Sequence, residues 1–335
     1  MKKIVFFLLA GCIVLGSCST GEAAASAAAK MFGGSSQALL FLNCRAVSED
    51  EIEFEFSRAV SVKSLNFVPE FEIALIEDGK TVRVRLKEAI MPGIQITADL
   101  LAEDENRNTV NVLVPFRSRN NRMPSLVINE VCTEFSNPRT EFIELKMKSA
   151  GNLGGMRVFI LGNTNASRQT IYEFMPVEVK KDEYVVLHLR TVEADCIDEY
   201  GRLDESGGRN SSPTARDFWI PGSVKLIHKT SMVYVLDQDD RALDAAVFSE
   251  NPDSWWNRDY FADAAAFLYE QGAWKSADGG IGSPADAVIS ARTTNTRTIN
   301  RNETAENSNT SADWYITVTS GATPGRPNNL NRFSN

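Results

Sequence analysis

The feature that most constrains the fold of this chain is a two-residue alternation of apolar and polar side chains in short runs. In EIEFEF, residues 51–56, the apolar side chains share one face and the glutamates share the other. KTVRVRLKEAI, residues 80–90, alternates in the same way, with Val82, Val84 and Leu86 on one side. This period is typical of antiparallel strands that bury one face. The sequence therefore predicts an all-β protein built from half-buried strands.

Turn-forming residues separate these runs, and no long helical pattern interrupts them. EDGK (77–80), MPG (91–93) and DENRN (104–108) carry the Gly, Pro, Asn and Asp residues that favour turns. Residues 37–118 are accordingly predicted to form a small β-sandwich. RNNRMPS, residues 119–125, is a polar segment containing proline, and it is predicted to link this domain to a second one.

The first domain also carries motifs in a defined order. F-S-x-x-V, L-x-x-x-x-x-P-G and D-x-x-x-N follow one another at residues 56–60, 86–93 and 104–108. This order resembles the immunoglobulin-like repeats of bacterial surface proteins. The resemblance implies an immunoglobulin-like sandwich that serves as a spacer or an adhesive module.

The N-terminus has the pattern of an export signal. Lys2 and Lys3 precede an apolar stretch, residues 4–15, that is too short to span a bilayer. The L-G-S-C sequence that ends at Cys18 resembles the lipobox of bacterial lipoproteins. The resemblance implies a signal peptide over residues 1–17, thioether lipidation of Cys18, and a membrane anchor of acyl chains such as palmitate. The alternative is an ordinary secretory signal that is cut nearby.

Residues 18–36 and the identity of Ser19 indicate where in the cell the protein is located. Residues 18–36 are small, polar and simple in composition, which predicts a flexible tether. Ser19, directly after the lipidated cysteine, favours the outer membrane over the inner membrane under a sorting rule of some bacteria. We therefore expect a lipid-anchored protein of the bacterial cell envelope. Whether its folded part faces the periplasm or the cell surface stays open.

The net charge and the cysteine spacing argue against nucleic-acid binding and against a zinc site. The formal net charge is −9 and no basic stripe appears, which argues against nucleic acid as the main partner. Cys44, Cys132 and Cys196 lack the CxxC spacing of a zinc site. They are predicted to be mostly buried free thiols, and one disulfide among them is left open. The sequence implies no cofactor.

The region from residue 126 onward carries an ordered set of further motifs. These are VINEV (127–131), EFIEL (141–145), NLGGM (152–156), VYVLD (233–237), LDAAVF (243–248), TINR (298–301), ADW (312–314) and ATPGRPN (322–328). As a set they resemble a lamin-tail domain, with Met156 where that family usually has an aromatic residue. The resemblance implies a second immunoglobulin-like β-sandwich over residues 126–330, enlarged by insertions that include one short helix.

Several glutamates fall within INEVCTEFSNPRTEFIEL, residues 128–145. Strand phase places Glu130 with the apolar residues before it and puts Glu141 and Glu144 on opposite faces, so one shared surface is not expected. The structural interpretation is that Glu130 and Glu141 accept hydrogen bonds from the backbone or from Arg301 and fix the register. The alternative, a metal site or an acid–base pair, lacks a histidine or a third acid at fixed spacing.

The two histidines are not expected to be catalytic. In EYVVLHLR, residues 183–190, His188 lies opposite the apolar side chains, so it is predicted to face solvent. His228 follows an apolar run near a strand end. Neither lies beside a recognised nucleophile or metalloprotease motif.

Two insertions enlarge the second domain. The first, residues 193–219, is either a calcium site or a solvated loop, and its acids do not have EF-hand spacing: Asp195, Asp198, Glu199, Asp204 and Glu205. The second, residues 251–274, is rich in aromatic residues and predicts one short helix that ends at Gly272. Its aromatics either plug one end of the sandwich or form a binding platform for sugars or a protein. The platform candidates are Trp255, Trp256, Tyr260 and Trp274.

These patterns indicate a cell-envelope protein without enzymatic activity that binds or scaffolds a protein or glycan through loops on rigid sandwiches. The lamin-tail resemblance keeps an alternative, because such bacterial domains often accompany secreted or membrane-attached hydrolases. A metal-dependent hydrolase would assemble its site from loop acids such as Asp195, Asp198 or Asp217. A purely structural envelope protein is the third interpretation.

Overall fold

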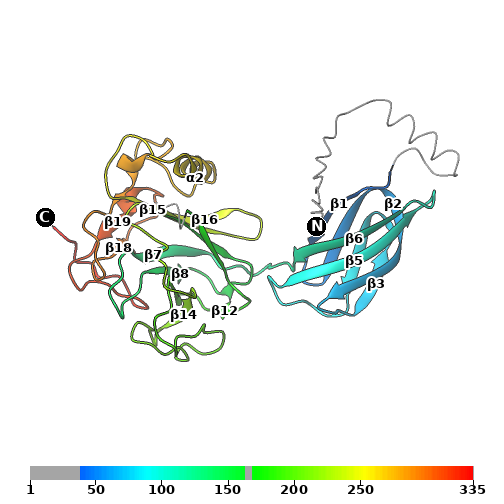
Figure 1. The fold of residues 1–335 in the computed structure, drawn as a ribbon, viewed down its shortest axis with the longest axis horizontal. Helices are drawn as coiled ribbons and strands as arrows, with labels where there is room; N and C mark the ends of the chain where they lie inside the picture. Colours follow the sequence, from blue (N-terminus) through cyan, green and yellow to red (C-terminus); the bar gives the residue numbers. More distant parts are fainter. Residues whose placement is uncertain (1–37, 163–167, 335) are drawn as a thin grey trace, which may run out of the picture. The chain divides into compact units, whose positions relative to one another are not determined.

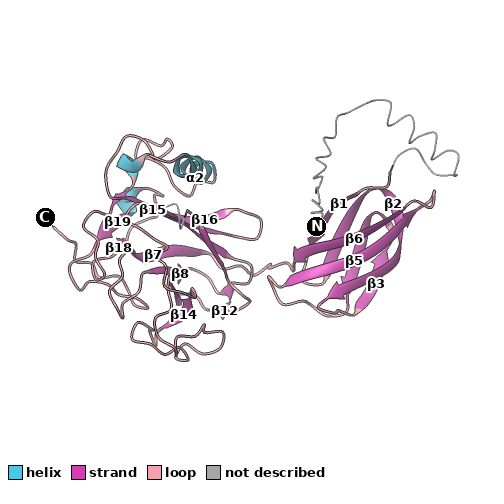
Figure 2. Cartoon of the chain, viewed as in Figure 1, coloured by secondary structure: helices cyan, strands magenta, loops and turns pink. Residues whose placement is uncertain are grey.

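The computed structural model describes residues 38–162 and 168–334 (Figure 1). Strands dominate this part of the chain, which contains one α-helix and two 3-10 helices (Figure 2). The expectation of an all-β fold is therefore confirmed at the level of a mostly β protein with several sheets. Among the described residues, no helix is both long and apolar enough to cross a membrane. The signal peptide, Cys18 and the tether lie outside the described residues.

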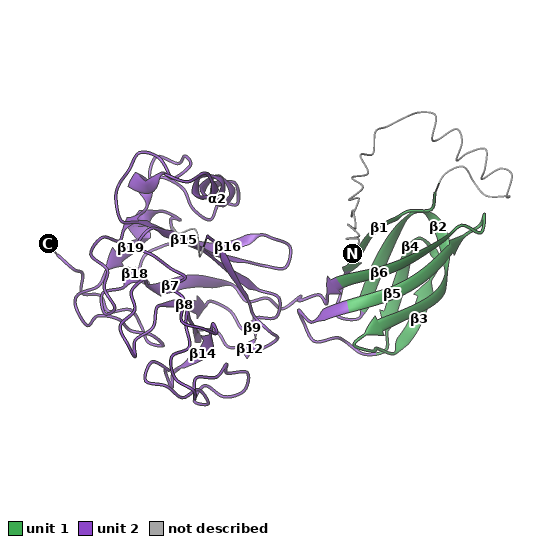
Figure 3. Ribbon diagram, viewed as in Figure 1, with its two compact units in different colours: residues 1–45, 51–87, 97–115 green, residues 46–50, 88–96, 116–335 purple. Residues whose placement is uncertain are grey.

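The chain divides into two compact units (Figure 3). Unit 1 consists of residues 1–45, 51–87 and 97–115, and unit 2 of residues 46–50, 88–96 and 116–335. Each unit buries its own set of apolar side chains.

Unit 1 is built on one six-stranded sheet in the order β3-β4-β2-β5-β6, with β1 also paired to β2. The strands are β1 (Phe41–Ala46), β2 (Glu51–Val68), β3 (Ile73–Glu77), β4 (Gly79–Leu86), β5 (Gln95–Asp104) and β6 (Thr109–Arg117). The 18 residues of β2 pair with β4 through their first part and with β5 through their second part. The long strand β2 therefore links the β3-β4 pair to the β5-β6 pair within one sheet.

The alternation predicted for unit 1 is confirmed. The inward side chains of β2 and β4 are at most 3% exposed: Ile52, Phe54, Phe56, Val82, Val84 and Leu86. On the other face, Arg83 Nε donates to Glu53 Oε1 across the two strands at 3.1 Å. Fully burying one large apolar side chain contributes about 1.5–3 kcal/mol, whereas an exposed ion pair contributes at most about 1 kcal/mol. The apolar face therefore supplies most of the stability of this sheet.

Unit 2 contains a six-stranded sheet, β14-β13-β8-β7-β18-β19, a five-stranded sheet, β11-β10-β15-β16-β17, and a two-stranded sheet, β12-β9. The bounds in the first sheet are β7 (Leu126–Cys132), β8 (Phe142–Met147), β13 (Tyr184–His188), β14 (Ala215–Trp219), β18 (Ile299–Arg301) and β19 (Trp314–Ile316). The others are β9 (Gly151–Asn152), β10 (Arg157–Gly162), β11 (Thr170–Glu173), β12 (Glu178–Val179), β15 (Ser231–Leu236), β16 (Ala242–Ser249) and β17 (Val288–Ile289).

One apolar cluster joins the two larger sheets of unit 2. Ile128, Ile143 and Leu145 of the six-stranded sheet belong to it, together with Val158 and Val233 of the five-stranded sheet. All five side chains are 0% exposed. The inner faces of the two sheets therefore pack on each other, which is the arrangement of a β-sandwich core.

The aromatic insertion forms α2 (Asp259–Glu270), which confirms the predicted helix. Phe261 and Leu268 of α2 are fully buried in the core cluster. Gly272, just after the helix, has a φ of +69°, a left-handed conformation that glycine adopts without strain. The 3-10 helices are η1 (Pro284–Asp286) and η2 (Ser311–Asp313).

A β-bulge in β7 changes the phase of that strand. Ile128 pairs with Leu145 and Glu130 pairs with Glu144, so Asn129 is the extra residue of the bulge. Glu130 therefore lies with Glu144 on the face opposite the core cluster. The prediction that Glu130 shares a face with the apolar residues before it is wrong. We call this second face the outer face of the six-stranded sheet.

Candidate functional site

The outer face of the six-stranded sheet carries a row of buried polar side chains. The strand register pairs Glu144 of β8 with Glu130 of β7, and Glu130 with Asn300 of β18. All three side chains are 0% exposed. Residues 322–328, which we call the C-terminal segment, bond directly to this row. Sequence reasoning kept these acids apart, and the structure brings Glu130 and Glu144 together.

The C-terminal segment is fastened to both glutamates. The Thr323 N–H lies 3.1 Å from each carboxylate oxygen of Glu130, and the Thr323 hydroxyl donates to Oε2 at 3.0 Å. The Gly325 N–H donates to Glu144 Oε2 at 2.6 Å. Asn129 Nδ2 donates to Glu144 Oε1 at 2.8 Å. A buried carboxylate needs such donors to offset the loss of water, so these bonds give both acids a structural role.

Burial makes both of these carboxyl groups weak acids. It raises the pKa of Glu130 to about 7, although hydrogen bonds from Thr298 and Thr323 oppose the shift. Burial and the neighbouring Glu130 raise the pKa of Glu144 well above its usual range. Ionisation of both carboxyl groups is unfavourable, because two negative charges in one buried site repel each other. Burial therefore favours the neutral form of both groups, and it leaves the pair no opening to a substrate.

Arg301 is not the partner of either predicted structural acid. Arg190 holds Glu141 through two bonds, one of them from Nε to Oε2 at 2.6 Å. Arg301 donates instead to Asp244 of β16 and, from Nε, to the Ile128 carbonyl at 2.7 Å. Arg301 therefore ties the two larger sheets of unit 2 together, and the prediction that it bonds Glu130 or Glu141 is wrong.

His188 is 0% exposed, so the prediction that it faces solvent is also wrong. On the outer face, its Nε2 lies 2.9 Å from Asp217 Oδ1 and its Nδ1 lies 3.1 Å from Thr140 Oγ1. The pairing of β14 with β13 places Trp219 against the imidazole, with 3.7 Å between ring centroids. A hydroxyl, an imidazole and a carboxylate in sequence resemble a nucleophilic triad. Thr140 is only 1% exposed, however, so the arrangement is structural.

The acidic insertion is partly internal. Asp217 is 0% exposed, and Asp198 accepts the Trp219 N–H at 2.8 Å. Glu199 is also 0% exposed and accepts backbone N–H bonds from Glu205, Ser206 and Asp217. The acids thus fasten the insertion to β14, while Asp195 and Asp204 are exposed. In residues 38–162 and 168–334, no three His, Cys, Asp or Glu side chains group as metal ligands.

The three cysteines of the described chain, Cys44, Cys132 and Cys196, are free thiols. Burial raises the pKa of the Cys132 thiol to about 12, so it stays protonated. Cys132 is buried as predicted, whereas Cys44 and Cys196 are partly exposed.

The aromatic platform candidates occupy different environments. Trp255 is 76% exposed. Trp256 and Tyr260 pack against the core cluster, and their polar atoms bond inward. Trp256 Nε1 donates to the Gly282 carbonyl and the Tyr260 hydroxyl donates to the Gly162 carbonyl, both at 3.0 Å. Only one of these three side chains is therefore mainly available to a partner.

Trp274 does not belong to an exposed platform. It is 1% exposed and lies in the core cluster of unit 2. The chain reverses after α2 at Gly272, and the ring of Trp274 then packs near the backbone of Gly282. The prediction that Trp274 contributes to a binding platform is therefore corrected. Most of the insertion plugs the sandwich, and Trp255 is its most exposed aromatic side chain.

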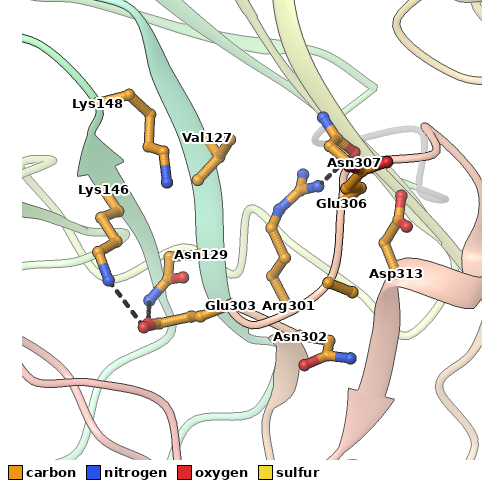
Figure 4. A pocket seen from close by; sticks show the side chains of 11 residues that line it. Val127, Asn129, Lys146, Lys148, Arg301, Asn302, Glu303, Glu306, Asn307 and Asp313 are labelled. Atoms are coloured by element: carbon orange, nitrogen blue, oxygen red, sulfur yellow. Dashed lines mark hydrogen bonds and ion pairs between the residues drawn. The ribbon is translucent and has the colours of Figure 1, made fainter.

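A pocket of about 180 Å³ lies beside the outer face (Figure 4). Strands β7 and β8 and the residue after β8 supply Val127, Asn129, Lys146 and Lys148. Strand β18 and the chain that follows it supply Arg301, Asn302, Glu303, Ala305, Glu306, Asn307 and Asp313. Sequence reasoning missed this pocket because its lining comes from segments far apart in the sequence, and five of its eleven residues lie in a loop without a motif, residues 302–307.

These features define a class: a mostly β protein in which the six-stranded sheet of unit 2 has its polar outer face bonded to the chain's own C-terminal segment. Residues 124–316, more than half of the chain, match the family model TP_1001_2nd, described as protein second domain. The chain belongs to this family.

Two further comparisons give a match in sequence and a match among solved structures. An uncharacterized protein of Treponema pallidum (strain Nichols) is 28% identical over 205 residues, which cover 58% of this chain and 51% of that protein. The chain thus spans about half the length of this curated relative. The crystal structure of the N-terminal part of the bacterial S-layer protein SbsC matches with a TM-score of 0.25 and 10% identity, over 45% of this chain and 44% of that one.

Proposed function

We propose that this protein is a lipid-anchored component of the bacterial cell envelope that binds a protein or glycan without enzymatic activity. Its proposed parts are a signal peptide (1–17), a lipidated Cys18 with a tether (18–36), an immunoglobulin-like domain (37–118), a linker (119–125) and a lamin-tail-like domain (126–330). The L-G-S-C sequence supports the anchor. The two packed sheets of unit 2 support a sandwich there, and unit 1 supplies a separate β unit built on one six-stranded sheet. The outer membrane is the proposed location.

The exposed indole of Trp255 carries the proposal of binding. It is 76% exposed, and the next residue, Trp256, is fixed by its bond to Gly282. A large aromatic side chain on a well-anchored backbone gives contact area at low entropic cost. Stacking on a sugar face or insertion into a protein pocket both use this property.

The burial of the reactive groups supports binding over catalysis. Glu130, Glu144, His188 and Asp217 are each 0% exposed. A general acid, base or nucleophile must reach its substrate within hydrogen-bonding distance. These four side chains are instead bonded to other residues of unit 2. A metal-dependent hydrolase would have to use the exposed loop acids, such as Asp195.

A binding assay tests the proposal. The full chain in detergent is presented to an array of immobilised glycans and extracellular matrix proteins. We expect a specific signal that Trp255→Ala reduces at least about tenfold, the scale of a central aromatic contact. The melting temperature of the variant should match that of the wild type, because the side chain is exposed.

The matched control is Leu113→Ala, which removes an equally exposed apolar side chain, 73% exposed, from unit 1. This variant should bind like the wild type. Equal binding by Trp255→Ala would contradict the platform. The lack of any wild-type signal on the array would favour the purely structural alternative.

A further inference from the structure

On the outer face, the carboxylate of Glu303 lies between a lysine and an asparagine side chain. Its Oε2 accepts Lys146 Nζ at 2.7 Å, and its Oε1 accepts Asn129 Nδ2 at 2.9 Å. Figure 4 shows both nitrogens directed at the end of the Glu303 side chain. An amine and an amide therefore meet at one carboxyl group, with one nitrogen at each of its oxygens.

Two neighbouring strands bring the amine and the amide to this carboxyl group. Lys146 belongs to β8 and pairs with Val127 of β7, two residues before Asn129. The Asn129 amide also donates from Nδ2 to Glu144 Oε1 at 2.8 Å, and Glu144 is two residues before Lys146 on β8. The amide is thus held beside the strand that carries the lysine.

This meeting point is largely closed to water. Asn129 is 0% exposed, and the side chains of Lys146 and Glu303 are each 17% exposed. The Lys146 ammonium lies 5.1 Å from the centre of the Tyr184 ring. Attack of an amine on an amide competes with hydrolysis, so the exclusion of water favours the lysine as the attacking group.

The arrangement has the parts that the exchange of one amide for another requires. The attacking nitrogen must lose a proton before it becomes a nucleophile, and the departing nitrogen must gain one. A single carboxyl group that bonds both nitrogens can perform both transfers. Holding the nucleophile beside its target also removes the entropic cost of an encounter in solution.

We propose that Lys146 and Asn129 form an intramolecular isopeptide bond, with Glu303 as the acid and base of the reaction. The Lys146 ammonium first gives a proton to Glu303. The neutral Nζ then attacks Asn129 Cγ, the Cγ–Nζ bond forms and the Cγ–Nδ2 bond breaks. Glu303 gives its proton to Nδ2 and receives a second one from Nζ, so ammonia leaves and Glu303 ends protonated.

The ion pair is the resting state before this reaction. Burial lowers the pKa of Lys146, but the hydrogen bond with Glu303 outweighs burial and leaves this pKa raised. The first proton transfer is therefore uphill and the reaction is slow, yet each molecule needs it only once. The product joins β7 to β8 in a chain whose described cysteines are all free thiols. Such a link restricts the unfolded chain as a disulfide does, and it goes beyond the proposed envelope function.

Peptide mapping of the full chain tests this inference. Trypsin cleaves after Lys and Arg, so an unlinked chain gives residues 123–139 and residues 140–146 as separate peptides. The isopeptide bond blocks cleavage at Lys146 and should give one branched peptide that joins residues 123–139 to residues 140–148. Its mass should be lower than the sum of these two segments by one ammonia molecule. Fragmentation should place the link at Lys146 and Asn129.

Three variants test the assigned roles. Lys146→Arg and Asn129→Ala should each abolish the branched peptide. Glu303→Gln keeps both partners and should slow its formation at least about tenfold, because general acid–base catalysis is lost. Glu306→Gln, at an exposed glutamate of the same loop, is the matched control and should match the wild type.

The wild-type chain decides the inference even if a variant fails to fold. Only linear peptides from wild-type protein after days of incubation would overturn the isopeptide bond. A branched peptide whose mass is lower by one water molecule would also overturn it, because that mass indicates a link to a carboxyl group. Wild-type rates in Glu303→Gln would contradict the role of this carboxyl group.

Discussion

Glu130 and Glu144 are paired across neighbouring strands on the outer face, and burial removes both carboxyl groups from bulk solvent. A carboxyl group whose pKa is raised by folding contributes stability that is complete below its unfolded pKa and is lost as the pH rises through its folded pKa. For Glu130 this window runs from the ordinary value of 4.5 to about 7. The free energy of unfolding should therefore fall across this window by up to about 3 kcal/mol from this residue.

Replacing Glu130 with glutamine removes the titrating group. Glu130→Gln should flatten the dependence of unfolding free energy on pH between 4.5 and about 7. Urea titrations followed by tryptophan fluorescence at several pH values measure this slope. Glu306→Gln, at an exposed glutamate, should keep the wild-type slope. An unchanged slope in Glu130→Gln would show that this carboxyl does not titrate as the structure implies.

Asp217 provides a second prediction for single residues. Its Oδ1 bonds His188, and its Oδ2 accepts the Ser212 N–H at 2.7 Å. Asp217→Ala leaves both buried donors unpaired, so unfolding should become easier by about 2–4 kcal/mol. Asp204→Ala, at an exposed acid of the same insertion, should change stability by less than about 0.5 kcal/mol. Similar small effects in both variants would contradict a structural role for the buried histidine.

At the scale of elements, the C-terminal segment depends on one close approach. Gly325 has a φ of +75°, and a Cβ placed there would lie 2.1 Å from Ser212 Oγ. The Gly325 N–H is also the donor to Glu144. A side chain at this position would therefore push the segment away from the glutamates that hold it.

A pair of alanine variants separates this packing from backbone strain. Gly279 also has a positive φ, +88°, but a Cβ at this position would meet no atom within 4 Å. Gly279→Ala should cost only backbone strain, about 1–2 kcal/mol. Gly325→Ala should cost about 1–3 kcal/mol more, because the segment must shift. Chemical denaturation measures both, and equal losses would show that the close approach is unimportant.

Sequence reasoning recovered the elements whose residues follow one simple period. The run at 51–56 lies in β2, and residues 80–86 of the run at 80–90 lie in β4. Both have the predicted inward faces, because each strand has one apolar face and one solvent-facing face. The helix α2 ends near Gly272 because glycine alone accepts the left-handed turn without strain. In both cases, residues that are close together in the sequence determine the structure of the element.

The candidate site was harder to predict because long-range contacts determine it. No local signal marks Asn129 as a bulge residue, and that one extra residue moved Glu130 to the outer face. His188 alternates like a solvent-facing residue, yet Trp219 of the neighbouring strand covers it. Trp274 was predicted to belong to an exposed platform, but the turn after α2 places its side chain in the core cluster. The alternation of side chains along one strand does not show whether another segment of the chain covers the face opposite the core.

At the scale of the whole molecule, the proposed function combines a proposed lipid anchor at Cys18 with the exposed indole of Trp255 in unit 2. The anchor rests on the sequence around Cys18, and the binding surface rests on the structure of unit 2. More than one acyl chain gives a stable membrane attachment, because each buried methylene adds about 0.8 kcal/mol. A variant that lacks the lipid should therefore be released from the membrane.

Metabolic lipid labelling tests whether Cys18 carries the proposed anchor. Cells producing the full chain or its Cys18→Ser variant are grown with an alkyne-tagged palmitate analogue, fractionated, and examined for label on the protein. The account predicts labelled wild-type protein in the membrane fraction, and an unlabelled Cys18→Ser variant that is released from it by mild washing. An unlabelled wild-type protein, or a Cys18→Ser variant labelled as strongly as the wild type, would contradict the proposed anchor at Cys18.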